Sequence, residues 1–218
     1  MPGARVAVPA GAWEPLTPDL YGGGSLGFIV IEGLVTRDLW IGERSMTQIF
    51  GPGDPVMPWP AVAGSVPPVA MWNVSEHPTL ALLDDQFTAA SRRWPSLGSA
   101  LHRLLVEHGD RAALQAAIAQ LPRVDQRLLA MLWHLADRFG RVSADGVVLP
   151  LDLTHETLGR LVGGQRPTIT LALGELAKAG TVARRADRTW LLAPLSADDL
   201  ATGPASLARW GAPHARML

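Results

Sequence analysis

The chain contains no cysteine among its 218 residues. This absence excludes disulfide bonds, thiolate metal sites, cysteine-ligated iron–sulfur clusters and cysteine nucleophiles together. The sequence also lacks an apolar stretch of the roughly 18 residues that a membrane helix needs. Its first residues carry Arg5, Pro9, Gly11 and Pro15 where a signal peptide would have an apolar core. We therefore expect a cytoplasmic protein without a membrane partner.

Charge of one sign is also missing, because the formal net charge is −1 at pH 7. This overall balance favours neither a nucleic acid nor an acidic membrane as a partner. The distribution is uneven, however, since six Lys and Arg residues stand against three acids between Leu153 and Trp190. The C-terminal third therefore carries a local positive excess in a chain that is slightly acidic.

Short strands are predicted in residues 1–94, which hold most of the prolines and glycines. Turn signals such as Gly51–Asp54 separate them. The candidate strands are Phe28–Ile31, Leu34–Ile41, Ser45–Phe50, Val66–Trp72 and Thr79–Leu83. Strands of this number and length predict a small antiparallel barrel or jelly roll. A helix capped by Asp84 and reaching about Arg93 is expected to follow.

A long helix is predicted over residues 95–121, where no proline follows Pro95 until Pro122. Apolar residues recur there in steps of three and four, and Gly109 is a point where the helix could bend. This stripe favours a dimerisation helix, and the alternative is that it packs only on the neighbouring barrel. Its members are Leu97, Leu101, Leu104, Leu105, His108 and Ala112.

A helix from Arg123 to Phe139, started by Pro122, and a strand at Val147–Leu151 come next. A short helix capped by Thr154 is then ended by Gly163-Gly164. Pro167 suits the first position of a second helix, which ends at Gly180. The buried stripe predicted for this second helix is Ile169, Ala172, Leu173, Leu176 and Ala177.

A two-stranded ribbon is predicted at Val182–Arg185 and Thr189–Leu192. Together with the two helices joined by a glycine turn, it makes a winged helix-turn-helix. The expected base contacts in the major groove are Gln165, Arg166, Thr168 and Leu171. The expected phosphate contacts are Thr154, His155, Thr170, Arg184, Arg185 and Arg188.

Two of these residues carry most of the argument for DNA. Arg166 can donate two hydrogen bonds to a guanine, and the apolar Leu171 suits a thymine methyl group. The alternative for each residue alone is an ordinary solvated arginine and an isolated exposed leucine. The helix-turn-helix and the basic wing around them favour DNA contact.

The order of these parts resembles the Crp/Fnr family of bacterial transcription regulators. The resemblance covers about Arg5 to Pro194. The stretches that carry it are FIVIEGLV (Phe28–Val35), GPGD (Gly51–Asp54), Leu149–Gly180 and VARR (Val182–Arg185). It implies a β-roll sensor domain, a long dimerisation helix, a C-terminal winged helix, and a base contact by Arg166.

The chain departs from the family pattern at several places. Many members have a glutamate where Pro167 stands, and a polar or basic residue is common where Leu171 stands. Members that bind cyclic nucleotides place an Arg-Ser or Arg-Thr pair at the phosphate, whereas this chain has no Lys or Arg between Arg44 and Arg92. A buried phosphate would have no cation in this segment, so we expect that cyclic AMP is not the signal.

Other sites in the first half are weakly indicated. The six histidines are dispersed, with only His77 in the predicted barrel, so no metal cluster is expected there. No Ser/His/Asp order or carboxylate pair marks an active site, and we expect neither a cofactor nor enzymatic activity. An unknown small-molecule effector stays open, with Met57, Trp59, Met71 and Trp72 as a candidate pocket or as plain core residues.

The sequence thus predicts an α+β protein in four parts. These are a β-roll sensor-like domain (1–94), a linking and dimerisation helix (95–121), a winged helix-turn-helix (122–195) and a tail (196–218). The predicted function is a homodimeric regulator of transcription that reads a near-palindromic site on double-stranded DNA, with RNA polymerase as a candidate partner. The alternative is a small-molecule-binding β-barrel protein whose winged helix serves protein–protein contacts.

Overall fold

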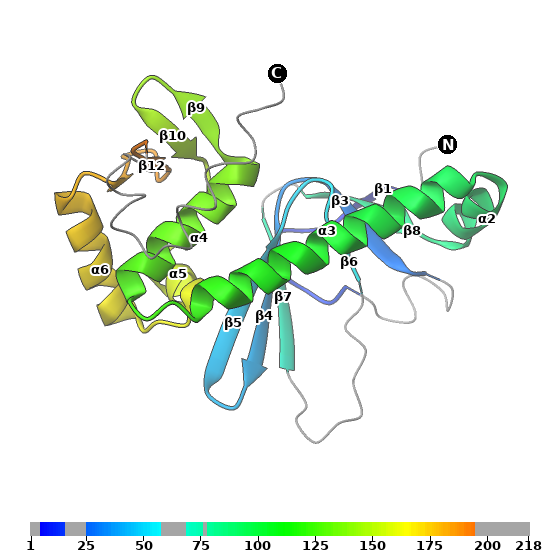
Figure 1. Ribbon diagram of the computed structural model, residues 1–218. Coiled ribbons are helices and arrows are strands. Elements are labelled where there is room, and N and C mark those ends of the chain that lie inside the picture. Colours follow the sequence, from blue (N-terminus) through cyan, green and yellow to red (C-terminus); the bar gives the residue numbers. More distant parts are fainter. Residues whose placement is uncertain (1–4, 16–24, 58–68, 76–77, 195–218) are drawn as a thin grey trace. The chain divides into compact units, whose positions relative to one another are not determined.

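The computed structural model describes residues 5–15, 25–57, 69–75 and 78–194, so Trp59 and the tail from residue 196 lie outside the described residues. The chain forms two compact units, Met1–Leu114 and Gln115–Leu218. Antiparallel sheets come first and a helix-rich unit follows, which confirms the predicted α+β class (Figure 1).

The first unit contains two four-stranded antiparallel sheets. In spatial order, one sheet consists of β1 (Arg5–Ala7), β8 (Thr79–Leu83), β3 (Gly27–Glu32) and β6 (Pro55–Val56). The other consists of β2 (Gly11–Trp13), β7 (Val69–Val74), β4 (Val35–Ile41) and β5 (Arg44–Phe50). The buried core draws on both sheets, with Phe28 and Leu80 from the first and Phe50 and Trp72 from the second.

Three of these strands were not predicted from the sequence. β1, β2 and β6 have only two or three residues each, which is too short for an alternating pattern to be recognised. Their pairing with β8, β7 and β3 completes the two sheets. The five strands that were predicted are present. Thr79–Leu83 has the predicted bounds, the ends of three others differ by at most one residue, and the strand predicted at Val66–Trp72 corresponds to β7, with residues 66–68 outside the described residues.

Two helices follow the β-roll. Asp84 caps α2 (Asp85–Arg93) as predicted, because its Oδ1 accepts the N–H of Phe87 at 3.0 Å. α3 (Pro95–Ala119) continues through Gly109 without interruption and ends two residues before the predicted Leu121. None of the helices in the described ranges combines the length and the apolar content that a membrane crossing requires.

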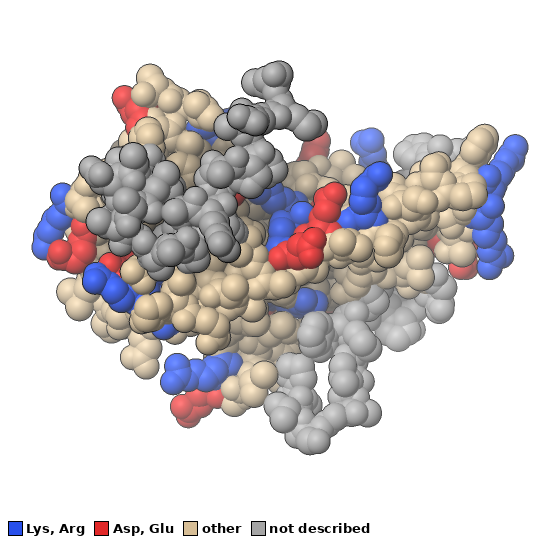
Figure 2. All heavy atoms as spheres, in the orientation of Figure 1, with Lys and Arg blue, Asp and Glu red and all other residues tan. Residues whose placement is uncertain are grey.

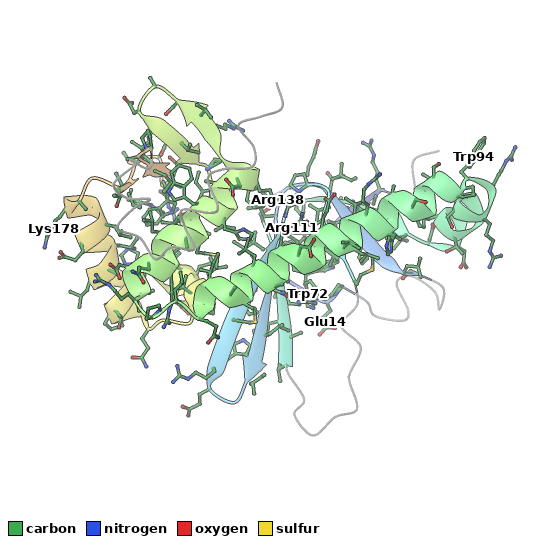
Figure 3. All side chains as sticks on the ribbon, in the orientation of Figure 1. Glu14, Trp72, Trp94, Arg111, Arg138 and Lys178 are labelled. Carbon is green, nitrogen blue, oxygen red and sulfur yellow. The ribbon has the colours of Figure 1, made fainter. Side chains whose placement is uncertain are left out.

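α3 is fastened to the β-roll by one ring stack and one ion pair. The imidazole of His108 stacks on Phe50 with 4.9 Å between ring centroids. Three residues further along α3, Arg111 Nη2 lies 2.7 Å from Asp54 Oδ1 (Figure 3). The side chain of Asp54 is 0% exposed and also accepts the N–H of Gly51 at 2.8 Å. The GPGD turn is therefore a docking point for the helix.

The second unit packs three helices on a four-stranded antiparallel sheet. The helices are α4 (Val124–Phe139), α5 (His155–Val162) and α6 (Arg166–Lys178). The strands, in spatial order, are β11 (Val182–Arg184), β12 (Trp190–Leu192), β10 (Gly146–Leu149) and β9 (Arg141–Ser143). Arg123 is the N-cap of α4, so Pro122 lies before the helix and does not start it. The strand β9 was not predicted, since it is a three-residue partner of β10.

Substitution of Arg111 by methionine tests the docking of α3. Arg111→Met leaves Asp54 buried without its cation, and we expect the free energy of unfolding to fall by about 2–3 kcal/mol. A fully buried pair would cost more, but the Arg111 side chain is 29% exposed. Urea unfolding measures the change, and Arg103→Met at an exposed position of the same helix is the control. Equal stability of the two variants would contradict the prediction.

Candidate nucleic-acid interface

A glycine turn joins α5 and α6 and brings the two helices close together. Thr154 caps α5, because its Oγ1 accepts the N–H of Thr157 at 3.1 Å. Gly163 ends the helix at φ 67°, a left-handed conformation that glycine adopts without strain. A Cβ on Gly159 would lie 2.6 Å from the carbonyl oxygen of Gly164. The predicted cap and turn are thus both present, and the turn requires a residue without a side chain at position 159.

α6 turns one side to the core and the other to solvent. Its buried residues are Ile169, Leu173 and Leu176. The predicted base-contacting residues are all exposed: Gln165, Arg166, Thr168 and Leu171. Leu171 is 72% exposed, which is unusual for a leucine on a helix whose other leucines are buried. Ala177 was predicted to be buried but is exposed, because it lies about 80° around the helix from Ile169 at the edge of the stripe.

Two of the predicted phosphate contacts are bonded to each other. His155, the first residue of α5, places its Nδ1 2.9 Å from Oγ1 of Thr170 on α6. The Thr170 hydroxyl in turn donates to the carbonyl oxygen of Arg166 at 3.0 Å. The chain of bonds links the N-terminus of α5 to the backbone of the residue predicted to contact a base.

The wing is the hairpin of β11 and β12. Arg184 is held inward, because its Nη1 donates to the carbonyl oxygen of Leu153 at 2.7 Å and its guanidinium lies 4.5 Å from the centre of the Trp190 ring. Asp152 accepts from Arg184 at 2.5 Å and pairs with Arg188 at 2.6 Å. Sequence analysis missed Asp152, which lies just before the basic segment and ties the wing to the start of α5.

Ion pairs neutralise most of the local positive charge. Besides the two pairs of Asp152, the pairs are Glu156–Arg160, Glu175–Lys178 and Asp187–Arg185. Hydrogen bonds from Thr189 hold the pKa of Asp187 below its usual range, which keeps this acid ionised. Within the described part of the chain no carboxylate pairs with Arg166. On the face drawn in Figure 2, blue and red side chains accordingly lie side by side.

α3 carries two different apolar surfaces. Leu97, Leu101 and Leu104 precede His108 in steps of four and three, and His108 contacts the β-roll. We call these four residues the roll-facing stripe. Leu105 and Ala112 lie instead on a second surface, the free face, which consists of Gly98, His102, Leu105, Gly109 and Ala112. The six residues predicted as one dimer stripe fall within about 100° of the helix circumference, and Leu105 lies at one edge of that arc.

The residues of the candidate pocket in the β-roll lie in different environments, and Trp59 lies outside the described residues. Met71 is 53% exposed whereas its neighbour Trp72 is 6% exposed, because adjacent strand residues point to opposite faces of a sheet. Met57 is half-buried at the end of β6. Trp72 thus belongs to the core, which was the alternative considered for it. No group of three potential ligands for a metal ion occurs among the described residues.

A buried arginine in the β-roll was missed by the sequence analysis. Arg37 on β4 is 8% exposed, and its Nε donates to Gln48 at 2.9 Å. Its guanidinium lies 5.4 Å from the centre of the Phe50 ring and 5.0 Å from that of Trp72. Burial lowers the pKa of Arg37 to about 10. The segment from Arg44 to Arg92 lacks Lys and Arg, whereas Arg37 lies on the strand before it and faces the core.

The C-terminal part of the chain matches a known domain family. The profile of the Crp-like helix-turn-helix domain matches residues 126–200. Regulatory protein CysR of Synechococcus elongatus is 27% identical over 168 residues, which are 75% of this chain and 74% of CysR. The global nitrogen regulator of the same organism is 31% identical over 70 residues, 32% of either chain.

Solved structures show the same fold over most of the chain. A CooA variant from Carboxydothermus hydrogenoformans is 20% identical with a TM-score of 0.67, over 95% of this chain and 87% of that one. A CRP-family transcriptional regulator from Thermus thermophilus is 20% identical with a TM-score of 0.61, over 94% and 95% of the two chains. The chain therefore carries a Crp-like helix-turn-helix domain at residues 126–200, and over most of its length it has the fold of these solved structures.

Proposed function

We propose that the chain is a homodimeric regulator of transcription, and not an enzyme, that reads a near-palindromic site on double-stranded DNA. The exposed N-terminal side of α6 carries this proposal. There Arg166 stands without an ion-pair partner among the described residues, and Leu171 is 72% exposed. An exposed leucine is unfavourable in water but suits a thymine methyl group, and an exposed guanidinium at the start of the same helix can donate two hydrogen bonds to a guanine.

The proposed phosphate contacts come from the start of α5 and from the wing. The N-terminus of α5, with Thr154 and His155, favours an anion through its partial positive charge. In the wing, Arg185 is the better placed cation, because its ion pair among the described residues is a long one, with 3.9 Å between its Nε and Asp187 Oδ2. Arg184 and Arg188 would have to exchange Asp152 for a phosphate, so their contacts with DNA stay a prediction.

The free face of α3 is the proposed dimer contact. Its residues follow one another in steps of four and three, the spacing of a two-stranded coiled coil. Apart from the nearby backbone of α3 itself, no atom of the described residues lies within 4 Å of the point where a side chain on Gly98 or Gly109 would begin. Leu105 is 39% exposed between them. A second copy of α3 would cover this surface and would bring two reading heads onto one palindromic site.

Cyclic AMP is not the proposed signal. The segment from Arg44 to Arg92 has no Lys or Arg, and Arg37 lies among aromatic rings of the β-roll core. Some structural relatives bind other molecules, as the OCPA complex of CprK illustrates. We propose a signal different from cyclic AMP that acts through the docking of α3 on the β-roll.

Loss of Arg166 should weaken specific binding. Arg166→Ala removes the guanine contact, and we expect a cost of ~1–3 kcal/mol on a site selected from random DNA, with relaxed preference at one base pair. Fluorescence anisotropy with the selected duplex measures this. Lys178→Ala removes a cation at the other end of α6 and serves as control (Figure 3). If Arg166→Ala bound the selected site as well as the wild type, α6 would not be the reading helix.

Leu171 should distinguish thymine from uracil. The two bases differ by one methyl group in the major groove, and burial of a methyl group is worth about 0.8 kcal/mol. We expect uracil at the critical position to weaken binding of the wild type about fourfold and to leave Leu171→Ala unchanged. Val142→Ala, at a 90% exposed apolar residue of β9, is the matched control and should keep the thymine preference. A wild type that is indifferent to uracil throughout the site would exclude this contact.

A charge on the free face should separate the dimer. Leu105→Glu would place two carboxylates against each other at the contact, and we expect the dimer dissociation constant to rise at least about tenfold. Sedimentation equilibrium measures the constant. Arg103→Glu, on an exposed part of α3 outside the free face, should leave it unchanged. Equal effects of the two variants, or a monomeric wild type at micromolar concentration, would contradict the assignment of the dimer contact.

A further inference from the structure

The bonds of His155 determine which of its nitrogens can meet DNA. A threonine hydroxyl has one hydrogen, and that of Thr170 is donated to the carbonyl oxygen of Arg166 at 3.0 Å. The same oxygen lies 2.9 Å from His155 Nδ1, and the direction of this bond depends on the ring tautomer. With the hydroxyl hydrogen on the carbonyl of Arg166, the oxygen is free to accept the N–H of the ring, and we assign the bond in this direction. The Nδ1 position therefore carries a hydrogen, and Nε2 is the nitrogen left for a ligand.

The protonation state of the ring then decides what Nε2 can bind. In the neutral imidazole with hydrogen on Nδ1, Nε2 has a lone pair and accepts hydrogen bonds only. A phosphate oxygen is also an acceptor, so neutral His155 cannot bond to it. The imidazolium donates from both nitrogens, and it can keep its bond to Thr170 while Nε2 donates to a phosphate.

The charged groups around His155 come from α5, from the segment before it and from α6. The dipole of α5 disfavours a cation at its first residue and favours an anion there. Glu156 beside it is engaged by Arg160 at 2.7 Å, and Asp152 before it is engaged by Arg184 and Arg188. From α6 the charged residue of the first turn is Arg166, another cation. A phosphate supplies the negative charge that the imidazolium needs.

We propose that His155 contacts a DNA phosphate only as an imidazolium, so that binding takes up one proton per subunit and tightens as pH falls. Thr170 is the positioning residue: it orients the ring and couples it to the backbone of Arg166. This inference rests on the proposed function, since it needs the N-terminus of α5 to face DNA. It assigns different roles to His155 and Thr170, both of which the sequence predicts to be phosphate contacts.

The test compares affinity at pH 8 and pH 6 over a range of salt concentrations, with the full chain and a selected duplex. We expect the wild type to bind roughly tenfold more tightly at pH 6. Its dependence of log affinity on log salt should steepen by about 0.9 per subunit, because one more phosphate is neutralised. His155→Gln should lose both effects. His155→Arg, a permanent cation, should bind tightly at both pH values.

Variants of neighbouring residues separate positioning from general charge. Thr170→Ser keeps the hydroxyl and should keep the pH profile, whereas Thr170→Val should abolish it. Glu156→Gln alters the charge next to His155 without an imidazole, so it should change affinity by the same factor at both pH values. Circular dichroism checks that each variant is folded. In the free protein, nitrogen NMR should find the hydrogen of neutral His155 on Nδ1.

The outcomes distinguish the two proposals. Absence of specific DNA binding by the wild type at either pH would overturn the proposed function itself. Specific binding with the same pH profile in the wild type and in His155→Gln would overturn only the role of His155. A hydrogen on Nε2 in the neutral ring would also overturn it, because Nε2 could then donate to a phosphate without protonation.

Discussion

The close packing of α6 on α5 across the glycine turn is the constraint on which the C-terminal unit depends. Gly163 reverses the chain in a left-handed conformation, and Gly159 leaves room for the carbonyl of Gly164. Any side chain at position 159 would push the helices apart. With this spacing, Thr170 of α6 comes within hydrogen-bond distance of His155 of α5. The relation between the proposed base-reading helix and the helix N-terminus proposed to face a phosphate thus depends on two residues without side chains.

Electrostatics in this unit is a matter of pairing more than of net charge. Asp152 holds both Arg184 and Arg188, and the acids on α5 and α6 hold the cations one turn away. If these cations bound DNA, each would exchange its carboxylate partner for a phosphate. The gain in binding free energy would be smaller than for arginines that have no ion pair in the free protein. Exposed pairs of this kind contribute little to stability, so such an exchange is inexpensive. Arg166, which has no ion-pair partner among the described residues, is the cation that we propose for the bases, where hydrogen-bond geometry discriminates between sequences.

α3 contacts the β-roll along one surface, and a neighbouring surface of the helix is the proposed dimer contact. On one side His108 and Arg111 fasten it to Phe50 and Asp54 of the β-roll. On the neighbouring surface, Leu105 is 39% exposed and lies between Gly98 and Gly109 along the helix. The predicted apolar residues form one continuous stripe, and periodicity alone does not tell its edge at the β-roll from its exposed edge. The distinction required the partner residues, which lie more than fifty positions away in the chain.

Local signals in the sequence determined much of this protein. The caps at Asp84 and Thr154, the turn at Gly163 and the exposed Arg166 and Leu171 could be predicted, because each depends on residues within one or two helical turns. The resemblance to the Crp/Fnr family followed from the order of the predicted elements along the chain. Tertiary structure alone decided that Asp152 holds the wing, that Arg37 is buried, and that His155 and Thr170 are bonded. These relations join residues on different elements, and their distances depend on how the elements pack, which periodicity and propensity do not encode.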